Sequence, residues 1–207
     1  MTFIDLKFSV QGMRFPLDHG YALYGALCRI LPDLHKCGHI GIHPIRGRAA
    51  GAGDLCVTDQ SRLCIRVPVD EIGVLLPLAG KSLVLDGRRL MVGVPQVYAL
   101  RPSANLAARM VTIKGFMEPA DFIEAARRQL VDLGISQEAE VIIPSVQEGR
   151  PNVGQPLRRV LRIKDKTVVG FGLRVLHLAA EECLTLQERG LGGRRHMGCG
   201  IFVPFRR

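Results

Sequence analysis

The chain has 207 residues, of which 47% are hydrophobic and 23% charged, which excludes a disordered chain and allows one large or two small hydrophobic cores. No apolar run approaches the roughly 20 residues that cross a bilayer, and the first residues contain an acid and no signal-peptide pattern, so we expect a cytoplasmic protein without a membrane partner. Residues 1–149 carry 16 basic and 15 acidic side chains, a net charge of +1, whereas residues 150–207 carry 12 basic and 4 acidic ones, a net charge of +8.

The first half of the chain predicts strands and helices in alternation. Apolar alternation indicates strands over residues 2–10, 39–43 and 62–67, and a hairpin of strands 83–85 and 90–92 around Asp86-Gly87. One helix begins after Asp18, its expected N-cap, carries an apolar stripe along one face and ends before Pro32. A short second helix is expected over residues 70–79, closed by Gly80.

The second half repeats this order after a predicted linker over residues 94–106. Strands are expected over residues 108–114, 141–143 and 201–203, with a loop over 149–156 and a hairpin of strands 160–164 and 167–176 around Asp165-Lys166. One helix is expected to begin at Glu118-Pro119 and to end before Gly134, and another to cover residues 178–188.

Each half therefore predicts a β-α-β-β-α-β unit. The fold class is α+β, with tandem ferredoxin-like (RRM-like) domains over residues 1–93 and 107–207. The first domain carries the candidate catalytic residues, and the second carries a basic hairpin and a glycine-rich loop. No close sequence repeat accompanies the pattern, so the duplication rests on the order of elements alone.

The six cysteines favour reduced, buried thiols over disulfides or a zinc site. No two of them have Cys-x-x-Cys spacing, and tetrahedral zinc sites usually show such tight ligand pairs. We expect neither a metal nor a cofactor.

The basic charge of residues 150–207 favours a polyanionic partner, either nucleic acid or an anionic membrane face. Basic residues that only improve solubility are the alternative, but these residues lie within strand patterns and a glycine loop rather than in a terminal tail. Aromatic residues are only 5% of the chain and Trp is absent, so platforms for base stacking are scarce. The composition therefore favours an RNA hairpin that is recognised by its shape and its phosphates.

Residues 190–200 form the most distinctive segment, with five glycines around Arg194, Arg195 and His196. A dinucleotide-binding fingerprint needs a strand before the glycines and a helix after them, and here the order is reversed. Backbone N–H groups at Gly192 and Gly193, together with the two arginines, are suited to phosphate binding. A merely tight helix-to-strand turn is the alternative, although fewer glycines would suffice for it.

A second basic cluster precedes or lies within the hairpin of residues 160–176. Arg162 and Lys164 are expected on one strand face, where they could follow an RNA backbone, and Arg158, Arg159 and Lys166 extend the cluster. A solvated hairpin edge is the alternative interpretation.

Four of the six histidines lie early in the chain, at positions 19, 35, 39 and 43. Cutting RNA without a metal needs a base for the ribose 2′-hydroxyl and an acid for the leaving 5′-oxygen, and imidazole suits both transfers. His35 follows Pro32 on a loop, Tyr24 lies beside the apolar stripe of the first helix, and His39 starts the next strand. Together they could surround one phosphate, although a histidine placed like His35 is also common at ordinary surfaces.

The two remaining early histidines have structural interpretations. His19 falls in the first helical turn, where a neutral structural imidazole is expected because helix N-termini disfavour imidazolium. His39 and His43 could share a strand face as a metal pair, but two ligands without a carboxylate are a weak set.

Two segments resemble the CRISPR-associated endoribonucleases that cut precursor CRISPR RNA at each repeat. The first runs from Pro16-Leu-Asp-His19-Gly-Tyr21 through Tyr24-Gly25 to Leu34-His35, and the second is the glycine-rich loop from Gly190 to Val203. In that family the loop also precedes the last strand of a second ferredoxin-like domain. The resemblance covers nearly the whole chain, and the loop is its more specific part.

The resemblance implies that His35 transfers protons and that Asp18-His19 is structural. It also implies cleavage without a metal, a 2′,3′-cyclic phosphate on the upstream fragment and a 5′-hydroxyl on the other. CRISPR repeat RNA is the implied partner, often retained within a guide-RNA interference complex with other subunits. Cys28 stands where some relatives have Tyr and His39 near where some have Lys, so the assisting residues depart from the family pattern.

Two other functions remain open from the sequence. A noncatalytic RNA-binding subunit of such a complex would share every charge and fold feature and differ only in whether His35 matters. A small-molecule-binding ferredoxin-like module would leave the charge of +8 over residues 150–207 unexplained.

Overall fold

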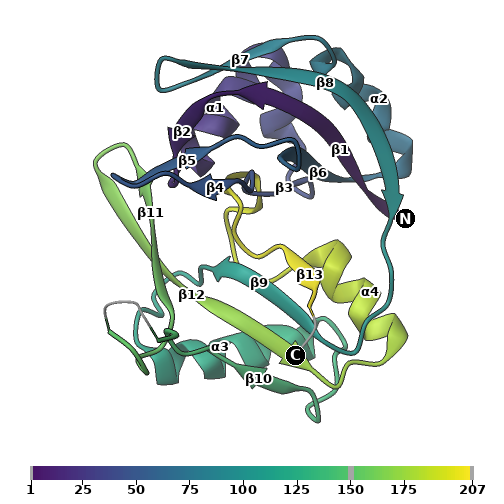
Figure 1. Ribbon diagram of the computed structural model, residues 1–207. Coiled ribbons are helices and arrows are strands. Elements are labelled where there is room, and N and C mark those ends of the chain that lie inside the picture. The colour runs from purple at the N-terminus through teal and green to yellow at the C-terminus, as the bar shows by residue number, and fades with distance from the viewer. Residues whose placement is uncertain (1, 149–151, 206–207) are drawn as a thin grey trace. The chain divides into compact units, whose positions relative to one another are not determined.

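The computed structural model describes residues 2–148 and 152–205, and the chain divides into two compact units (Figure 1). The first unit contains Met1–Leu100 together with His196–Gly198, and the second contains Arg101–Arg195 together with Cys199–Arg207. Among the described residues, no helix has the length and apolar character needed to cross a bilayer.

The first unit is built on a five-stranded antiparallel sheet. The strand order is β3 (Gly41–Ile42), β6 (Arg62–Pro68), β1 (Phe3–Gly12), β8 (Arg88–Ala99) and β7 (Ser82–Leu85). Leaving out the edge strand β7, the order follows the β-α-β-β-α-β plan that the sequence predicts. Asp86 and Gly87 have φ values of +47° and +79°, as a two-residue hairpin turn requires.

Helix α1 (Gly20–Ile30) packs on this sheet through Leu23, Ala26 and Leu27, which are buried. Its N-cap is His19 and not Asp18, so the predicted start was one residue early. Pro32 ends the helix as predicted and opens a 3₁₀ helix, η1 (Pro32–Lys36). The chain therefore places a short, tight turn directly after α1.

The second helical segment is broken into three pieces: η2 (Val69–Glu71), α2 (Ile72–Leu75) and η3 (Leu76–Leu78). Pro77 explains the last break, since proline lacks the N–H that would continue the α-helical hydrogen bonds. Gly80 follows with φ of +76°, in agreement with its predicted role as the terminator.

Three features of the first unit differ from the prediction. The strand expected over residues 39–43 is only Gly41–Ile42, and β8 continues to Ala99, so the linker expected over 94–106 begins within a strand. A small additional sheet, with the order β2 (Arg14–Pro16), β5 (Asp54–Cys56) and β4 (Arg48–Ala49), was not predicted. Strands of two or three residues are too short for alternation to show.

The second unit repeats the same plan. Its strand order is β10 (Glu140–Ile142), β12 (Lys166–Leu176), β9 (Leu106–Val111) and β13 (Phe202–Pro204), with β11 (Arg158–Ile163) paired to the first half of β12. Helix α3 (Pro119–Asp132) starts at the predicted Glu118-Pro119 and ends before Gly134, and α4 is Ala180–Arg189. Residues 149–151 of the predicted loop lie outside the described residues.

Each unit has its own hydrophobic core. In the first, Leu6 and Phe8 of β1 and Leu63 and Ile65 of β6 are buried with the apolar face of α1. In the second, Phe122 of α3 lies against Phe171 of β12, with ring centroids 4.9 Å apart. The α+β class and the tandem ferredoxin-like order are thus confirmed.

Candidate functional site

His35 lies on η1, the 3₁₀ helix that directly follows α1, and its side chain is exposed. Its Nδ1 donates a hydrogen bond to the carbonyl oxygen of Pro32. Because a carbonyl only accepts, Nδ1 carries a proton, and in the neutral ring Nε2 is then the unprotonated nitrogen. The structure therefore presents His35 with a basic nitrogen directed away from its own helix turn.

Tyr24 and His196 form a stacked pair within the first unit, to which residues 196–198 belong. Their ring centroids are 5.1 Å apart and the rings are inclined by 20°. His196 Nε2 also lies 2.7 Å from the carbonyl oxygen of Cys37, immediately after η1. Burial, and then the neighbouring Cys28 thiol, raise the pKa of Tyr24, so its hydroxyl keeps its proton well above neutral pH.

His39 and His43, which the sequence offered only as a weak metal pair, face different carboxylates. His39 Nε2 is 2.7 Å from Glu71 Oε2, whereas His43 Nε2 is 3.5 Å from Asp5 Oδ1. Neither histidine lies in a strand, because β3 contains only Gly41 and Ile42 of the three residues between them. The idea that they share a strand face is therefore wrong.

His19 is a structural histidine, as the sequence suggested. It is 2% exposed, its Nδ1 donates to Pro16 O at 2.9 Å, and its Nε2 accepts from the Ile45 N–H at 3.0 Å. This pattern fixes a neutral ring with the proton on Nδ1.

The glycine-rich loop runs from α4 to β13, the helix-then-strand order that the sequence indicated. Gly192 and Gly193 are exposed, but their N–H groups donate to Gln129 Oε1 at 3.0 Å and to Thr112 O at 2.9 Å. The Gly200 N–H donates to Met110 O at 2.8 Å. These three N–H groups bind the loop to its own unit, and phosphate binding through Gly192 and Gly193 would have to displace existing partners.

The two arginines of the loop have different environments. Arg194 is exposed and adopts φ of +63°. Arg195 is 8% exposed, and its Nη2 donates to the carbonyl oxygen of Glu188 at 2.7 Å. The predicted RNA contact of Arg194 is compatible with its exposed side chain, whereas that of Arg195 is not favoured because its side chain is buried against α4.

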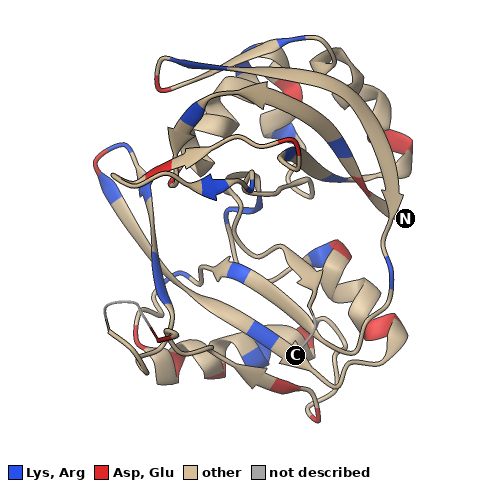
Figure 2. Cartoon of the chain, in the orientation of Figure 1, with Lys and Arg blue, Asp and Glu red and all other residues tan. Residues whose placement is uncertain are grey.

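The basic hairpin has a different register from the expected one. Lys164, with φ of +52°, occupies the turn with Asp165, and Lys166 already belongs to β12, so Lys164 does not share a strand face with Arg162. Arg158 and Arg162 instead lie on one exposed face of β11, while Arg159 is half-buried on the other. Figure 2 shows the resulting run of basic segments along β11 and around the turn.

Comparison with known proteins identifies the family of the chain. The family model described as Cas6 Crispr matches residues 4–207. A curated relative from Myxococcus xanthus (strain DK1622), named CRISPR-associated endonuclease Cas6, is 43% identical over 204 residues, which cover 99% of this chain and 82% of the relative. The chain belongs to the Cas6 family.

Solved structures agree with this family in fold. A Cas6-related protein from Pyrococcus furiosus superposes with a TM-score of 0.67 at 14% identity, covering 97% of this chain and 98% of that one. Cse3 of Thermus thermophilus, solved with an RNA representing a pre-cleavage complex, superposes with a TM-score of 0.50 at 15% identity and covers 98% of each chain. At such identities the likeness concerns the fold alone.

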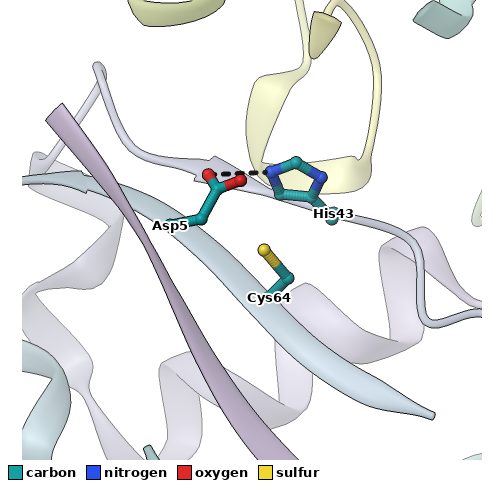
Figure 3. A group of neighbouring side chains, drawn as sticks. All are labelled: Asp5, His43 and Cys64. Atoms are coloured by element: carbon teal, nitrogen blue, oxygen red, sulfur yellow. Dashed lines mark ion pairs between the residues drawn. The ribbon is translucent and has the colours of Figure 1, made fainter. Parts of the chain in front are cut away.

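A polar cluster in the first unit of this Cas6 chain was missed by the sequence analysis. Arg66 is 1% exposed and binds Asp5 through both ends of the carboxylate, with Nε–Oδ1 at 2.7 Å and Nη2–Oδ2 at 3.0 Å. His43 and Cys64 complete the group, and the ligand-type atoms of Asp5, His43 and Cys64 lie within 4.8 Å of one another (Figure 3). The alternation of β6 predicted Arg66 on a polar face but not its burial.

The charges of this cluster favour an ion pair over a metal site. Burial alone would raise the pKa of Asp5, but the His43 imidazole 3.5 Å away and the hydrogen bonds from Arg66 outweigh burial and hold that pKa well below its usual range. Burial raises the pKa of the Cys64 thiol far above its ordinary value and lowers the pKa of His43. Arg66 already occupies both oxygens of the Asp5 carboxylate, so the carboxylate that a divalent ion would need is bound to a cation.

We predict that Asp5→Asn destabilises the protein by about 3–5 kcal/mol at pH 7, because it leaves Arg66 buried without a counter-ion. Urea denaturation measures this loss, and Asp59→Asn, at an exposed carboxylate, is the matched control with no expected loss. Because the pKa of Asp5 is depressed in the folded state, its contribution is complete above about pH 4 and disappears as the pH falls further. Equal stability of the two variants would refute the ion-pair interpretation.

Adjacent glycines of the loop should respond differently to alanine. A Cβ at Gly192 would lie 2.3 Å from Thr112 O, and φ there is +70°, whereas a Cβ at Gly193 would meet nothing within 4 Å. We expect Gly192→Ala to cost about 1–3 kcal/mol and Gly193→Ala to be neutral or slightly stabilising. The comparison of their urea midpoints tests this, and matching midpoints would mean that the loop does not depend on the close approach to β9.

Proposed function

We propose that this Cas6 chain is a metal-independent endoribonuclease that cuts precursor CRISPR RNA within its repeats. The observation that carries the proposal is His35, an exposed imidazole whose Nδ1 proton is held by Pro32 and whose Nε2 is the basic atom. Membership of the family and the endonuclease name of its Myxococcus relative support the reaction class.

His35 Nε2 takes the proton of the ribose 2′-hydroxyl next to the scissile phosphate. The 2′-oxygen then attacks phosphorus, and the bond from phosphorus to the 5′-oxygen breaks. The products are a 2′,3′-cyclic phosphate on the upstream fragment and, after the leaving oxygen gains a proton, a 5′-hydroxyl on the downstream one. Such proton transfers are worth about 10²–10⁴ in rate, and none of them needs a metal ion.

The assisting residues are Tyr24 and His39. Tyr24 keeps its phenolic proton because its pKa is raised, so its hydroxyl is a hydrogen-bond donor for the phosphorane or the leaving oxygen. His39 faces Glu71, which orients its ring, and Lys36 adds an exposed cation next to His35 in η1. Lys36 Nζ lies 2.6 Å from Asp33 Oδ1, and it adds positive charge near the phosphorane once a phosphate replaces that carboxylate.

RNA binds through the exposed basic residues of the second unit. Arg158 and Arg162 share one face of β11, Lys164 lies at the turn, and Arg194 lies on the glycine-rich loop. These exposed cations suit the phosphates of a repeat hairpin, which accords with the RNA-bound state of the Thermus Cse3 structure. Contacts from Arg159, Gly192, Gly193 and Arg195 are secondary, because each of these is buried, half-buried or already hydrogen-bonded.

The reaction takes place in the cytoplasm, where six free cysteines remain reduced. After cleavage the product stays bound through its phosphates and is passed to other subunits of an interference complex. The alternative function is an RNA-binding subunit that does not cut. The cleavage experiment below distinguishes it from the proposed endoribonuclease.

Cleavage of labelled repeat hairpins in EDTA tests the role of His35. Wild type should cut at one site, and His35→Ala should bind equally well but cut about 10²-fold slower or worse, because it lacks the general base. His177→Asn is the control, since His177 is an exposed histidine of the second unit that pairs with Glu140. Unchanged cleavage by His35→Ala would transfer the role to Tyr24 or His39, and wild type that binds without cutting would support a noncatalytic subunit.

Neutralising the exposed face of β11 tests the RNA surface. Arg158→Gln with Arg162→Gln should weaken binding and reduce the slope of log K against log salt by about 0.7–0.9 for each lost phosphate contact. Arg127→Gln with Arg128→Gln removes the same charge from exposed positions of α3 and should change the slope less. Equal losses from both pairs would show that only net charge matters, and the hairpin would then have no special place in binding.

A further inference from the structure

The 3₁₀ helix that carries His35 is weakly anchored by its own residues. Within η1 only Leu34 is buried, and Asp33, His35 and Lys36 are exposed. A 3₁₀ helix has poorer hydrogen-bond geometry than an α-helix, and this one has five residues. Leu31 and Cys37, which flank η1, also pack on the core, so the position of His35 depends on how these two ends of η1 are held.

His196 supplies a second anchor from the far end of the chain. Its Nε2 lies 2.7 Å from the Cys37 carbonyl oxygen, which only accepts, so Nε2 donates the hydrogen bond. The same carbonyl accepts from the Ile40 N–H at 3.2 Å, so both of its lone pairs are used. The His196 ring is fixed in turn by its stack on Tyr24 of α1.

The loop around His196 is itself closely packed. His196 lies in η4 (Arg195–Met197), and Gly198 follows with φ of +84°. A Cβ at Gly198 would lie 2.7 Å from Pro44 Cγ, so only glycine permits this approach. The imidazole is thus fixed by its stack on Tyr24 and by its hydrogen bond to Cys37 O, and its backbone is fixed within η4.

We propose that His196 is a positioning residue that fixes η1, through the Cys37 carbonyl, so that His35 meets the 2′-hydroxyl. This inference rests on the proposed function of His35. It replaces the expectation that His196 binds RNA, because the donor atom of the ring is committed to a backbone carbonyl. Arg194, which is exposed two residues earlier, is the phosphate contact of this loop.

Three substitutions separate the hydrogen bond from the stack. His196→Phe keeps a ring on Tyr24 but has no donor, His196→Gln keeps an N–H donor without the ring, and His196→Ala keeps neither. Single-turnover cleavage of the repeat hairpin should fall about tenfold to a hundredfold in the Ala and Phe variants, since small displacements of a catalytic group cost this much. The Gln variant should recover most of the rate. RNA affinity and its salt slope should match wild type in all three.

Two results would overturn the inference. If His196→Ala cuts like wild type, η1 does not need this anchor. If the affinity of His196→Ala falls and its salt slope drops by about 0.7–0.9, His196 contacts a phosphate instead. The exposed His177→Asn variant is again the control for loss of a histidine.

Amide hydrogen exchange provides a readout that does not depend on cleavage. The Leu34 and Cys37 amides donate to Leu31 O and Leu34 O within η1, and they should exchange faster in His196→Ala and His196→Phe than in wild type or His196→Gln. Unchanged exchange refutes the anchor even if cleavage falls. If wild type never cuts the repeat but the variants still show these differences in exchange, the proposed function is refuted and the anchoring of η1 by His196 is supported.

Discussion

The backbone of the glycine-rich loop packs closely against strand β9, and this packing determines which side chains of the loop are exposed on the second unit. Gly193 and Gly200 donate to Thr112 and Met110 of the segment that contains β9, at 2.9 and 2.8 Å. A Cβ at Gly192 would lie 2.3 Å from Thr112 O, and a Cβ at Gly200 would lie 2.1 Å from Leu191 O within the loop itself, distances that real Cβ atoms do not reach. The glycines therefore serve first to seat the loop, and the loop in turn directs Arg194 outward and Arg195 inward. Of the two arginines, Arg194 is the one that the solvent can reach.

Much of the fold was predictable because it depends on local patterns. Alternation over β1 and β6, the Asp86-Gly87 turn, and the Glu118-Pro119 start of α3 each specify an element from neighbouring residues alone. The failures have equally local causes. Strands of two or three residues carry no period, and Pro95 and Pro102 suggested a linker where β8 in fact continues to Ala99. Proline in a strand is compatible with positions whose N–H the sheet does not need, and sequence alone does not identify these positions.

The candidate site was less predictable because it is made by contacts between distant residues. Placing His35 just after the first helix followed from Pro32, a local signal. The contact between His196 and Cys37 joins residues 159 positions apart, and no periodic pattern in the sequence predicts it. The same holds for Arg66, which alternation placed on a polar face but which Asp5, 61 positions away, keeps buried as an ion pair. A basic residue in a strand can thus be exposed or be buried in an ion pair, and the partner that decides between these is distant in the sequence.

These contacts bear on how the chain could combine cutting with retention of RNA. A general base contributes about 10²–10⁴ in rate, which corresponds to roughly 3–5 kcal/mol of the barrier and is lost when the base is misplaced by about an ångström. Phosphate contacts tolerate much larger errors, since they act over the screening length of about 8–10 Å. The exposed arginines of β11 can therefore lie on a hairpin without further support, whereas His35, on a 3₁₀ helix with one buried residue, needs a second anchor. On this argument the glycine-rich loop has two tasks in residues two positions apart: Arg194 is exposed to solvent, where the proposed RNA would lie, and His196 is hydrogen-bonded to the residue that follows the proposed catalytic segment η1.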